Sequence, residues 1–238
     1  MAYMSAITYT VAKARIARAL GGQGDAAMLG AAGECLSQAM SEWNMKRDWN
    51  WTLTTNANIT TVAGTSEYVL ATDVKKMYDA RLSGNKRELS YIDEREWRNA
   101  RWDQTTTGTP MFYTEVFMGT PLTTYIKLGP IPNSSGETVI VRYFRKIAAP
   151  TADVDTLDIP AVYENGLIFL AKALMLADRD AENARTSFFH TKAMEVLTHA
   201  IAEDDRQPDR GDRFIASAEH MKSAYDPTHP YFYLQLND

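Results

Sequence analysis

The sequence contains a single cysteine, Cys35, so an intrachain disulfide framework and a cysteine-based zinc site are excluded. It also has no apolar run close to the roughly 20 residues that span a bilayer. The opening segment, MAYMSAITYTVAKARIARAL, lacks a basic region followed by an uninterrupted apolar stretch, so no cleaved signal peptide is expected. These absences predict a protein that works in aqueous surroundings, without a membrane partner.

Net positive charge is missing as well. The 238 residues carry a formal net charge of -5, which argues against a basic surface that grips phosphate backbones. Contact with DNA as a wall that does not hold it remains compatible with this charge. With 45% hydrophobic and 23% charged residues, the composition is that of an ordinary globular protein.

Familiar catalytic and cofactor motifs are absent too. None of the four histidines has H-E-x-x-H spacing, and His190 and His199 would point to opposite sides of one helix. Gly22 to Ala27 faintly resembles a dinucleotide fingerprint but follows a helical pattern where a strand is needed. No P-loop or G-x-S-x-G sequence occurs. We therefore expect no cofactor, no metal site and no catalytic residues.

Helical periodicity is present at both ends of the chain. A first segment at 7–20 runs into LGGQGD, where glycine can end a helix in the left-handed conformation. Asp25 can cap a second helix, whose apolar residues up to Trp43 share one face. The helical period returns after residue 160, in one segment from Tyr163 and another from Phe189 to Ile201.

Residues 51–149 follow a strand pattern. From Trp51 to Ile59, apolar and small residues alternate with polar ones, which predicts a strand with one buried face. Asp93, with Glu96 three residues later, can cap a helical turn that carries Trp97. Further strands are predicted at 68–70, 77–82, 111–118, 123–128 and 138–145, with TTTGTP as a loop and 129–136 as a turn.

The predicted fold is α+β, a helical bundle domain with an inserted antiparallel β-sandwich or barrel and an extended C-terminal arm. The predicted boundaries are 1–50 and 150–206 for the two halves of the helical body, 51–149 for the inserted module and 207–238 for the arm. Three tryptophans, Trp43, Trp49 and Trp51, lie at the first border. We interpret them as an apolar wedge at the module joint, and a platform that stacks on carbohydrate is the alternative.

The order of several short segments resembles a known family. After the second helical segment come RDWNW, YVLATDVKKM, GTPMFY, IKLGPIP, VIVRYFRK and DTLDIP. This layout, over about residues 5–205, resembles the head-to-tail adaptor proteins of short-tailed bacteriophages, the tail tubular protein A type of connector. The family has no shared catalytic residues.

The resemblance implies a structural subunit of the phage neck in the virion. It implies a homo-oligomeric ring, commonly of twelve copies, under the portal protein, with the tail nozzle and possibly fibre proteins below. Double-stranded DNA would pass through the lumen without specific binding. A mildly acidic chain suits such a channel.

The C-terminal segment is the expected portal anchor. Asp-Pro and His-Pro favour extended backbone, and aromatic residues on an extended polar segment are typical of arms that dock on a partner. An arm wrapped on a neighbouring subunit is the alternative. The residues expected to bind the portal are Tyr225, Pro227, His229, Pro230, Tyr231, Phe232, Tyr233 and Leu234.

Two other function classes remain open. A virion protein that degrades peptidoglycan or binds glycans would use tryptophans and paired carboxylates of the β module. A bacterial helical regulator with an inserted sandwich is the third. The carboxylates in question are Glu67, Asp73, Asp79, Glu88, Asp93, Glu96, Glu115 and Glu137.

Overall fold

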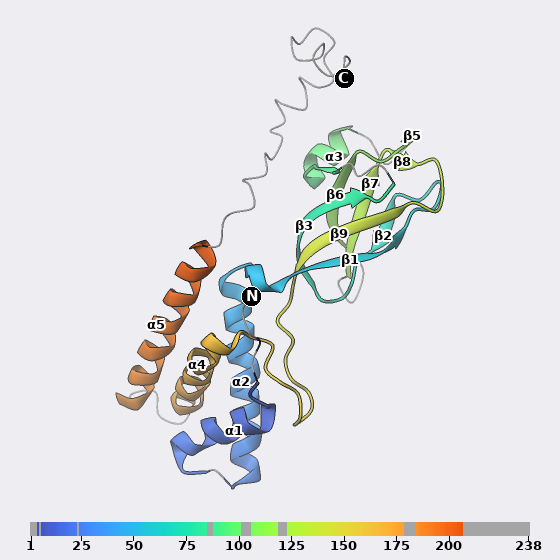
Figure 1. The fold of residues 1–238 in the computed structure, drawn as a ribbon. Coiled ribbons are helices and arrows are strands. Elements are labelled where there is room, and N and C mark those ends of the chain that lie inside the picture. Colours follow the sequence, from blue (N-terminus) through green and yellow to red (C-terminus); the bar gives the residue numbers. More distant parts are fainter. Residues whose placement is uncertain are drawn as a thin grey trace. The chain divides into compact units, whose positions relative to one another are not determined.

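A computed structural model describes residue 4 and residues 6–22, 24–84, 88–100, 106–118, 123–178 and 184–206. These residues divide between two compact units, and the border between the units falls after Thr52 and again after Arg145. One unit is helical and the other is built of strands (Figure 1). Mixed helix and antiparallel sheet confirm the predicted α+β class.

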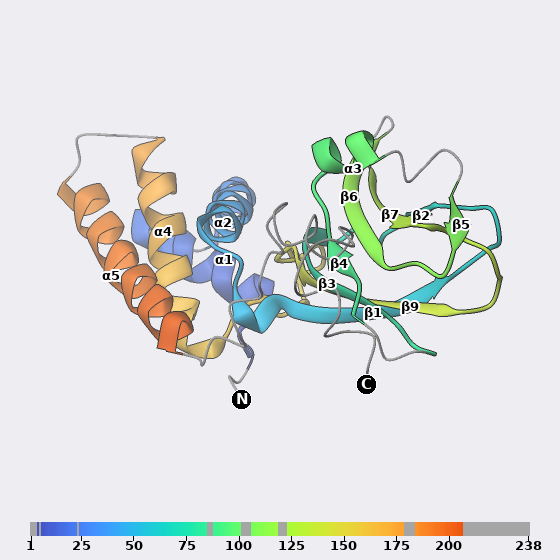
Figure 2. The same cartoon turned by 90° about the horizontal axis from the view of Figure 1, so that it is seen from above.

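The helical unit is built of helices that precede and follow the strands in the sequence. In Figure 2, α4 lies between α2 and α5. Short 3₁₀ turns follow α1, precede the first strand and precede α4. The helices are α1 (Tyr9–Ala17), α2 (Ala26–Lys46), α4 (Glu164–Ala177) and α5 (Ala184–Arg206), and the 3₁₀ turns are η1 (Arg18–Leu20), η2 (Asn50–Thr52) and η3 (Ala161–Tyr163).

Local signals in the sequence set the helix ends. Gly21 adopts a positive φ of 76° and ends η1, as the glycine-rich LGGQGD segment predicts. The side chain of Asp25 accepts a hydrogen bond from the Ala27 amide at 2.9 Å and so caps α2, which confirms that prediction. Gly166 allows close packing of α4, because a Cβ there would lie 2.5 Å from the Val196 side chain and 3.1 Å from Trp43.

The helical unit has one continuous apolar core. It draws on α1, α2, α4 and α5 and on the segment that precedes η3. Ile16, Leu36 and Leu167 are fully buried in it, as the shared apolar faces of the helical segments predict. Among the described residues, no helix combines the length and the hydropathy that a membrane span requires.

The sheet unit contains two main sheets, ordered β1-β9-β3 and β2-β7-β6-β4. A further pair of two-residue strands, β5 and β8, is parallel, as is the pairing of β4 with β6. The strands are β1 (Leu53–Thr60), β2 (Glu67–Val69), β3 (Val74–Leu82), β4 (Ser90–Tyr91), β5 (Thr107–Gly108), β6 (Phe112–Met118), β7 (Thr123–Gly129), β8 (Ile131–Pro132) and β9 (Thr138–Arg145).

The two main sheets share a core, which makes the unit a small sandwich. Leu82 and Val141 come from one sheet and Ile126 and Leu128 from the other, and all four are fully buried in one cluster. The helix α3 (Glu94–Ala100) packs separately, with Trp97 buried against Ile92 and Phe112. The Asp93 carboxylate accepts a hydrogen bond from the Glu96 amide at 2.9 Å, which confirms the predicted cap.

Three sequence predictions in this region are wrong in detail. The strand does not begin at Trp51, because Thr52 turns back on Trp49 through its amide and its hydroxyl and closes the 3₁₀ turn η2. Thr55 is exposed although the alternation places it inside, and the register of β1 shifts between Asn56 and Ile59. TTTGTP and the 129–136 turn each contain a short strand, β5 and β8.

The β module is predicted to fold independently of the helical unit. We expect a fragment of residues 51–148 to unfold in a single cooperative thermal transition, because its strands share a core of their own. Circular dichroism of the fragment measures this. Ile126→Asp, which buries a charge in that core, should abolish the transition. A disordered spectrum for the unsubstituted fragment would contradict the insertion model.

Candidate functional site: the tryptophan junction and a groove of the helical unit

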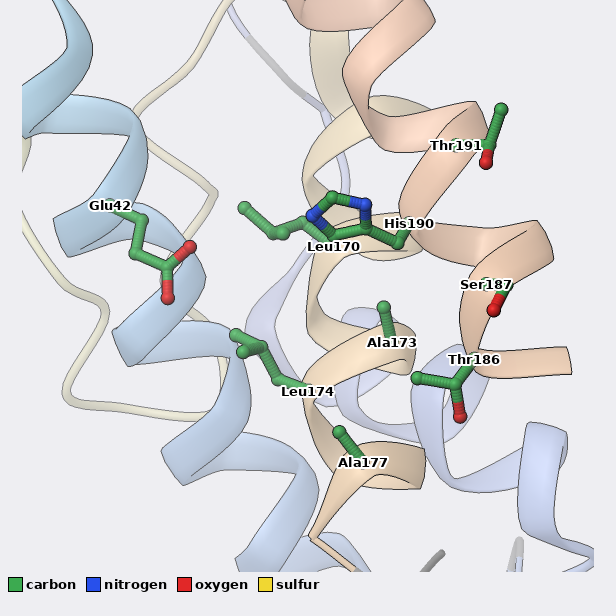
Figure 3. A pocket seen from close by; sticks show the side chains of 9 residues that line it. All are labelled: Glu42, Leu170, Ala173, Leu174, Ala177, Thr186, Ser187, His190 and Thr191. Atoms are coloured by element: carbon green, nitrogen blue, oxygen red, sulfur yellow. The ribbon is translucent and has the colours of Figure 1, made fainter. Parts of the chain in front are cut away.

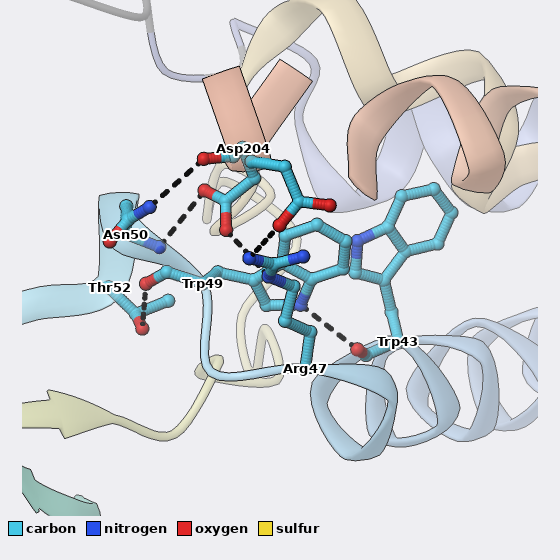
Figure 4. Close-up of polar contacts among 7 residues, drawn as sticks. Trp43, Arg47, Trp49, Asn50, Thr52 and Asp204 are labelled. Atoms are coloured by element: carbon cyan, nitrogen blue, oxygen red, sulfur yellow. Dashed lines mark hydrogen bonds and ion pairs between the residues drawn. The ribbon is translucent and has the colours of Figure 1, made fainter. Parts of the chain in front are cut away.

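The three junction tryptophans form a continuous stack. The ring centroids of Trp43 and Trp49 are 6.0 Å apart and those of Trp49 and Trp51 are 6.4 Å apart, with 27° between the planes in both pairs. Trp43 and Trp49 are each 1% exposed and belong to the core of the helical unit, and Trp51 packs against that core. The Trp49 indole nitrogen donates to the Trp43 carbonyl oxygen at 3.0 Å, which fixes the ring in the stack (Figure 4).

A polar network ties this segment to the end of α5. The Asn50 amide donates to a carboxylate oxygen of Asp204 at 3.1 Å, and the Asn50 side chain donates to the Asp204 carbonyl at 3.2 Å. Arg47 forms ion pairs with Asp204 at 2.9 Å and Asp205 at 2.5 Å. Figure 4 shows these groups converging beside the Trp49 ring. The network satisfies one of the last carbonyl groups of α5, which helix geometry leaves without an intrahelical partner.

The carboxylate of Asp204 is buried, so its stability depends on its hydrogen-bond and ion-pair partners. The Asp204 side chain is only 3% exposed. Burial raises the pKa of its carboxyl group, and the hydrogen bonds of Asn50 and the charge of Arg47 oppose that effect. Removal of Arg47 would therefore leave a buried carboxylate with fewer compensating contacts.

The returning chain is held to the same helical unit. The Ile147 amide donates to the Asn44 side-chain oxygen at 3.3 Å, and the Ile147 side chain packs on the helical core. Close by in the fold, the Tyr163 hydroxyl donates to Glu203 at 2.8 Å, and its ring lies 6.4 Å from that of Trp43. Both chain crossings between the units are thus anchored in the helical unit by packing and hydrogen bonds.

A groove of about 480 Å³ lies on the helical unit (Figure 3). Its apolar residues come from α4, its Glu42 comes from α2, and its hydroxyl and imidazole groups come from α5. Gln38 donates to Glu42 at 3.3 Å. The lining residues are Glu42, Leu170, Ala173, Leu174, Ala177, Thr186, Ser187, His190 and Thr191. No sequence motif marks this groove, because its residues become neighbours only when three helices pack.

Four of the eight β-module carboxylates of the glycosidase alternative make structural contacts. Glu67 pairs with Lys127 at 2.7 Å and Asp79 pairs with Arg142 at 2.9 Å. Asp73 accepts a hydrogen bond from the Tyr143 hydroxyl at 3.0 Å, and Asp93 caps α3. Such contacts are what structural carboxylates make.

Glu115 on β6 has a different environment. Burial raises the pKa of its carboxyl group, and a backbone hydrogen bond from Met77 and the charge of Lys76 oppose the shift. A general acid needs a raised pKa, so Glu115 is the carboxylate that most favours the glycosidase hypothesis.

The other predicted site residues have different outcomes. The arm residues from Tyr225 to Leu234 lie outside the described part of the chain, so their role stays a prediction. The role of Trp43, Trp49 and Trp51 as a module joint also stays a prediction, while their rings stack in the structure. Within the described ranges, no group of three or more His, Cys, Asp or Glu residues could hold a metal ion.

The network around Arg47 and Asp204 and the groove beside Glu42 were not found from the sequence. Asn50 and Asp204 are 154 positions apart, so no local pattern signals their contact. The periodic apolar residues of α2, α4 and α5 predict that these helices pack together. They do not predict where the packed helices leave a groove.

Aromatic packing and ion pairs fix the course of the chain at the tryptophan junction. A comparison with protein families gives the class of the protein. Residues 7–217 match the family model described as SU10 adaptor protein. The match covers most of the chain, and the protein belongs to this family. It is a phage adaptor and a structural component of the virion. None of the curated proteins matches the chain.

Proposed function

We propose that this adaptor is a ring-forming subunit of the phage neck, of the tail tubular protein A type. The ring, of twelve copies, joins the portal protein to the tail nozzle and surrounds the channel through which DNA leaves. The family match over residues 7–217 carries this proposal. The net charge of -5 supports a channel wall that does not hold DNA.

Co-sedimentation with purified portal rings tests the proposal. The chain is expected to bind portal with one adaptor per portal subunit, because a ring joined to a ring of equal symmetry makes one equivalent contact per subunit. Native mass spectrometry of the complex gives the ratio. Failure to bind portal, or binding of single copies, would contradict the neck role.

Contacts between neighbouring copies are proposed to be partly ionic. The helical faces carry both charge signs, at Asp178 and Arg185 among the described residues; Arg179, Asp180 and Glu182 lie outside them. Raising the salt concentration from ~0.1 M to ~1 M shortens the Debye length from about 10 Å to about 3 Å, so assembly on portal should weaken. Sedimentation over that range measures it, and assembly indifferent to salt would contradict ionic contacts.

The chain is proposed to have no enzymatic activity. The competing function is peptidoglycan hydrolysis by Glu115 with Glu67, and the raised pKa of Glu115 is its one favourable observation. Glu67 is aligned with Lys127 on β7, whereas Glu115 is aligned with the neighbouring residue, Ile126. The two carboxylates therefore lie on opposite faces of the sheet and cannot flank one glycosidic bond, so we expect the pure protein to leave purified cell wall intact. Turbidity of a cell-wall suspension measures this. Clearing that Glu115→Gln or Glu67→Gln abolishes, while Glu137→Gln does not, would establish the enzyme reading.

A further inference from the structure

The last turn of α5 carries three consecutive carboxylates, Glu203, Asp204 and Asp205. Negative charge is unfavourable at the C-terminal end of a helix, because the last carbonyl groups already carry partial negative charge. Arg206, the last residue of α5, sets one positive charge against three negative ones. Burial raises the pKa of Asp204, and the charge of Asp205 raises it further. By its own sequence, this turn is a weak end to the helix.

Partners from outside α5 engage all three carboxylates. The Tyr163 hydroxyl donates to Glu203 at 2.8 Å. The Asn50 amide donates to Asp204 at 3.1 Å, and the Asn50 side chain donates to the carbonyl of the same residue at 3.2 Å. Arg47 pairs with Asp204 at 2.9 Å and with the carboxylate that follows it at 2.5 Å (Figure 4). The end of α2, the turn η2 and the turn η3 therefore hold the last turn of α5.

This arrangement has two competing states. In the helical state the Asp204 side chain is 3% exposed, and its charge is balanced by Asn50 and Arg47. If the turn unwinds, the three carboxylates reach water and move away from the helix end. A buried carboxylate that loses its partners is costly, so loss of the partners favours the unwound state.

The position of the turn in the chain gives this choice a consequence. Asn50 belongs to η2 (Asn50–Thr52), which is followed directly by β1 of the sheet unit. The C-terminal segment, 207–238, follows α5 directly in the sequence. One polar network thus holds both the point where the chain leaves for the strands and the point from which the C-terminal segment starts.

We propose that residues 203–206 form a conditional turn, helical only while Arg47, Asn50 and Tyr163 hold its carboxylates, and that this turn couples η2 to the start of the C-terminal segment. We name residues 203–206 the α5 latch. Displacement of η2 breaks the Asn50 contacts and releases the latch, and by reciprocity an unwound latch releases η2. The coupling goes beyond the proposed neck role, since it requires neither a ring nor a portal.

Hydrogen exchange of the full-length chain tests the latch. The amides of residues 203–206 donate to carbonyl groups one turn earlier in α5, so they exchange when the turn unwinds. Arg47→Ala should speed their exchange by at least ~10-fold, because two ion pairs are lost and one of them is buried. The core amides of Leu36 and Leu170 should keep their rates, which separates local release from global unfolding.

A matched control removes a cation from α5 itself. Lys192 pairs with Glu195 at 2.7 Å on the exposed side of the helix. Lys192→Ala should leave the exchange of residues 203–206 unchanged, because exposed ion pairs contribute little. Arg47→Lys, which can keep one of the two ion pairs of Arg47, should give an intermediate rate and serves if Arg47→Ala does not fold.

Removal of the charges distinguishes a conditional turn from a passive anchor. Glu203→Gln, Asp204→Asn and Asp205→Asn, combined with Arg47→Ala, should return the exchange of the latch to within about threefold of the unsubstituted chain. The charges that unwind the turn are then absent, so Arg47 is no longer needed. A passive anchor depends on Arg47 whatever the charge of the turn.

The coupling is tested from the other side of the network. Thr52→Val removes the hydroxyl that donates to the Trp49 carbonyl and closes η2. It should speed exchange of the latch by at least ~3-fold, although the Thr52 hydroxyl makes its contact within η2. Thr198→Val, which removes an exposed hydroxyl bonded to the Met194 carbonyl within α5, is the control and should have no such effect. Asp204→Ala should in turn speed exchange of the Thr52 amide.

Each outcome decides one part of the proposal, provided that far-UV circular dichroism shows every variant to be folded. Unchanged exchange of residues 203–206 in Arg47→Ala would overturn the latch. Faster exchange that removal of the three charges does not reverse would show a passive anchor and also overturn it. An effect of Thr52→Val no larger than that of Thr198→Val would overturn the coupling. Release in Arg47→Ala, rescue by charge removal and two-way coupling together support it.

Discussion

Replacing Trp49 with alanine is expected to lower the free energy of unfolding of the helical unit by ~3–5 kcal/mol, the range for removal of a large aromatic side chain from a core. Trp49 is 1% exposed and stacks between Trp43 and Trp51. Its indole also donates to the Trp43 carbonyl, so the substitution leaves that oxygen without this donor. Urea unfolding followed by the helical signal measures the loss.

Two further substitutions show what the Trp49 side chain contributes. Trp49→Phe keeps an aromatic ring and should recover a large part of the loss, apart from the hydrogen bond, worth ~1 kcal/mol. Phe188→Ala, at a residue that is 56% exposed, should change stability by less than about 1 kcal/mol. A loss below about 1 kcal/mol for Trp49→Ala would contradict the view that the stack is part of the core.

Deletion of residues 223–238 is expected to abolish capture by portal rings while leaving the chain folded. The helical core and the sandwich core both lie upstream of this segment. The deleted segment carries the aromatic residues of the predicted arm. Each aromatic anchor residue that is lost from an interface is expected to weaken the affinity for portal by more than about tenfold. Co-sedimentation with portal measures capture, and circular dichroism confirms folding.

A matched substitution separates the arm's aromatic residues from its length. Full-length protein with Tyr231, Phe232 and Tyr233 all changed to serine should fail in the same way. If the truncated chain binds portal as tightly as the full one, the anchor lies elsewhere. If the truncated chain binds portal but no longer forms rings, the arm wraps a neighbouring subunit instead.

Local sequence signals predicted much of the fold. The Gly21 turn and the caps at Asp25 and Asp93 are encoded within a few residues, and all three are confirmed. The sequence also predicts a change from helix to strand near Asn50. In the structure the chain first makes the 3₁₀ turn η2 and only then a strand. Thr52 causes this offset, because its hydroxyl donates to the Trp49 carbonyl at 2.7 Å. A side chain that competes for backbone groups is invisible to apolar periodicity.

Contacts between residues far apart in the chain could not be predicted from local sequence patterns. The sequence shows three tryptophans close together at the junction, but their stacking depends on how Trp51 turns back toward Trp49. The contact between Asn50 and Asp204 joins the 3₁₀ turn η2, at the end of the first half of the helical unit, to the last turn of α5. Likewise, the stacked rings of Phe169 and Phe189 come from α4 and α5. Only tertiary packing brings such residues together.

Electron microscopy of the chain assembled on portal, viewed along the assembly axis, tests the central claim most directly. The account predicts a closed ring with an open centre and twelve repeats, matched to the portal above. Single copies scattered on the portal, or a monomeric chain that clears purified cell wall, would contradict it.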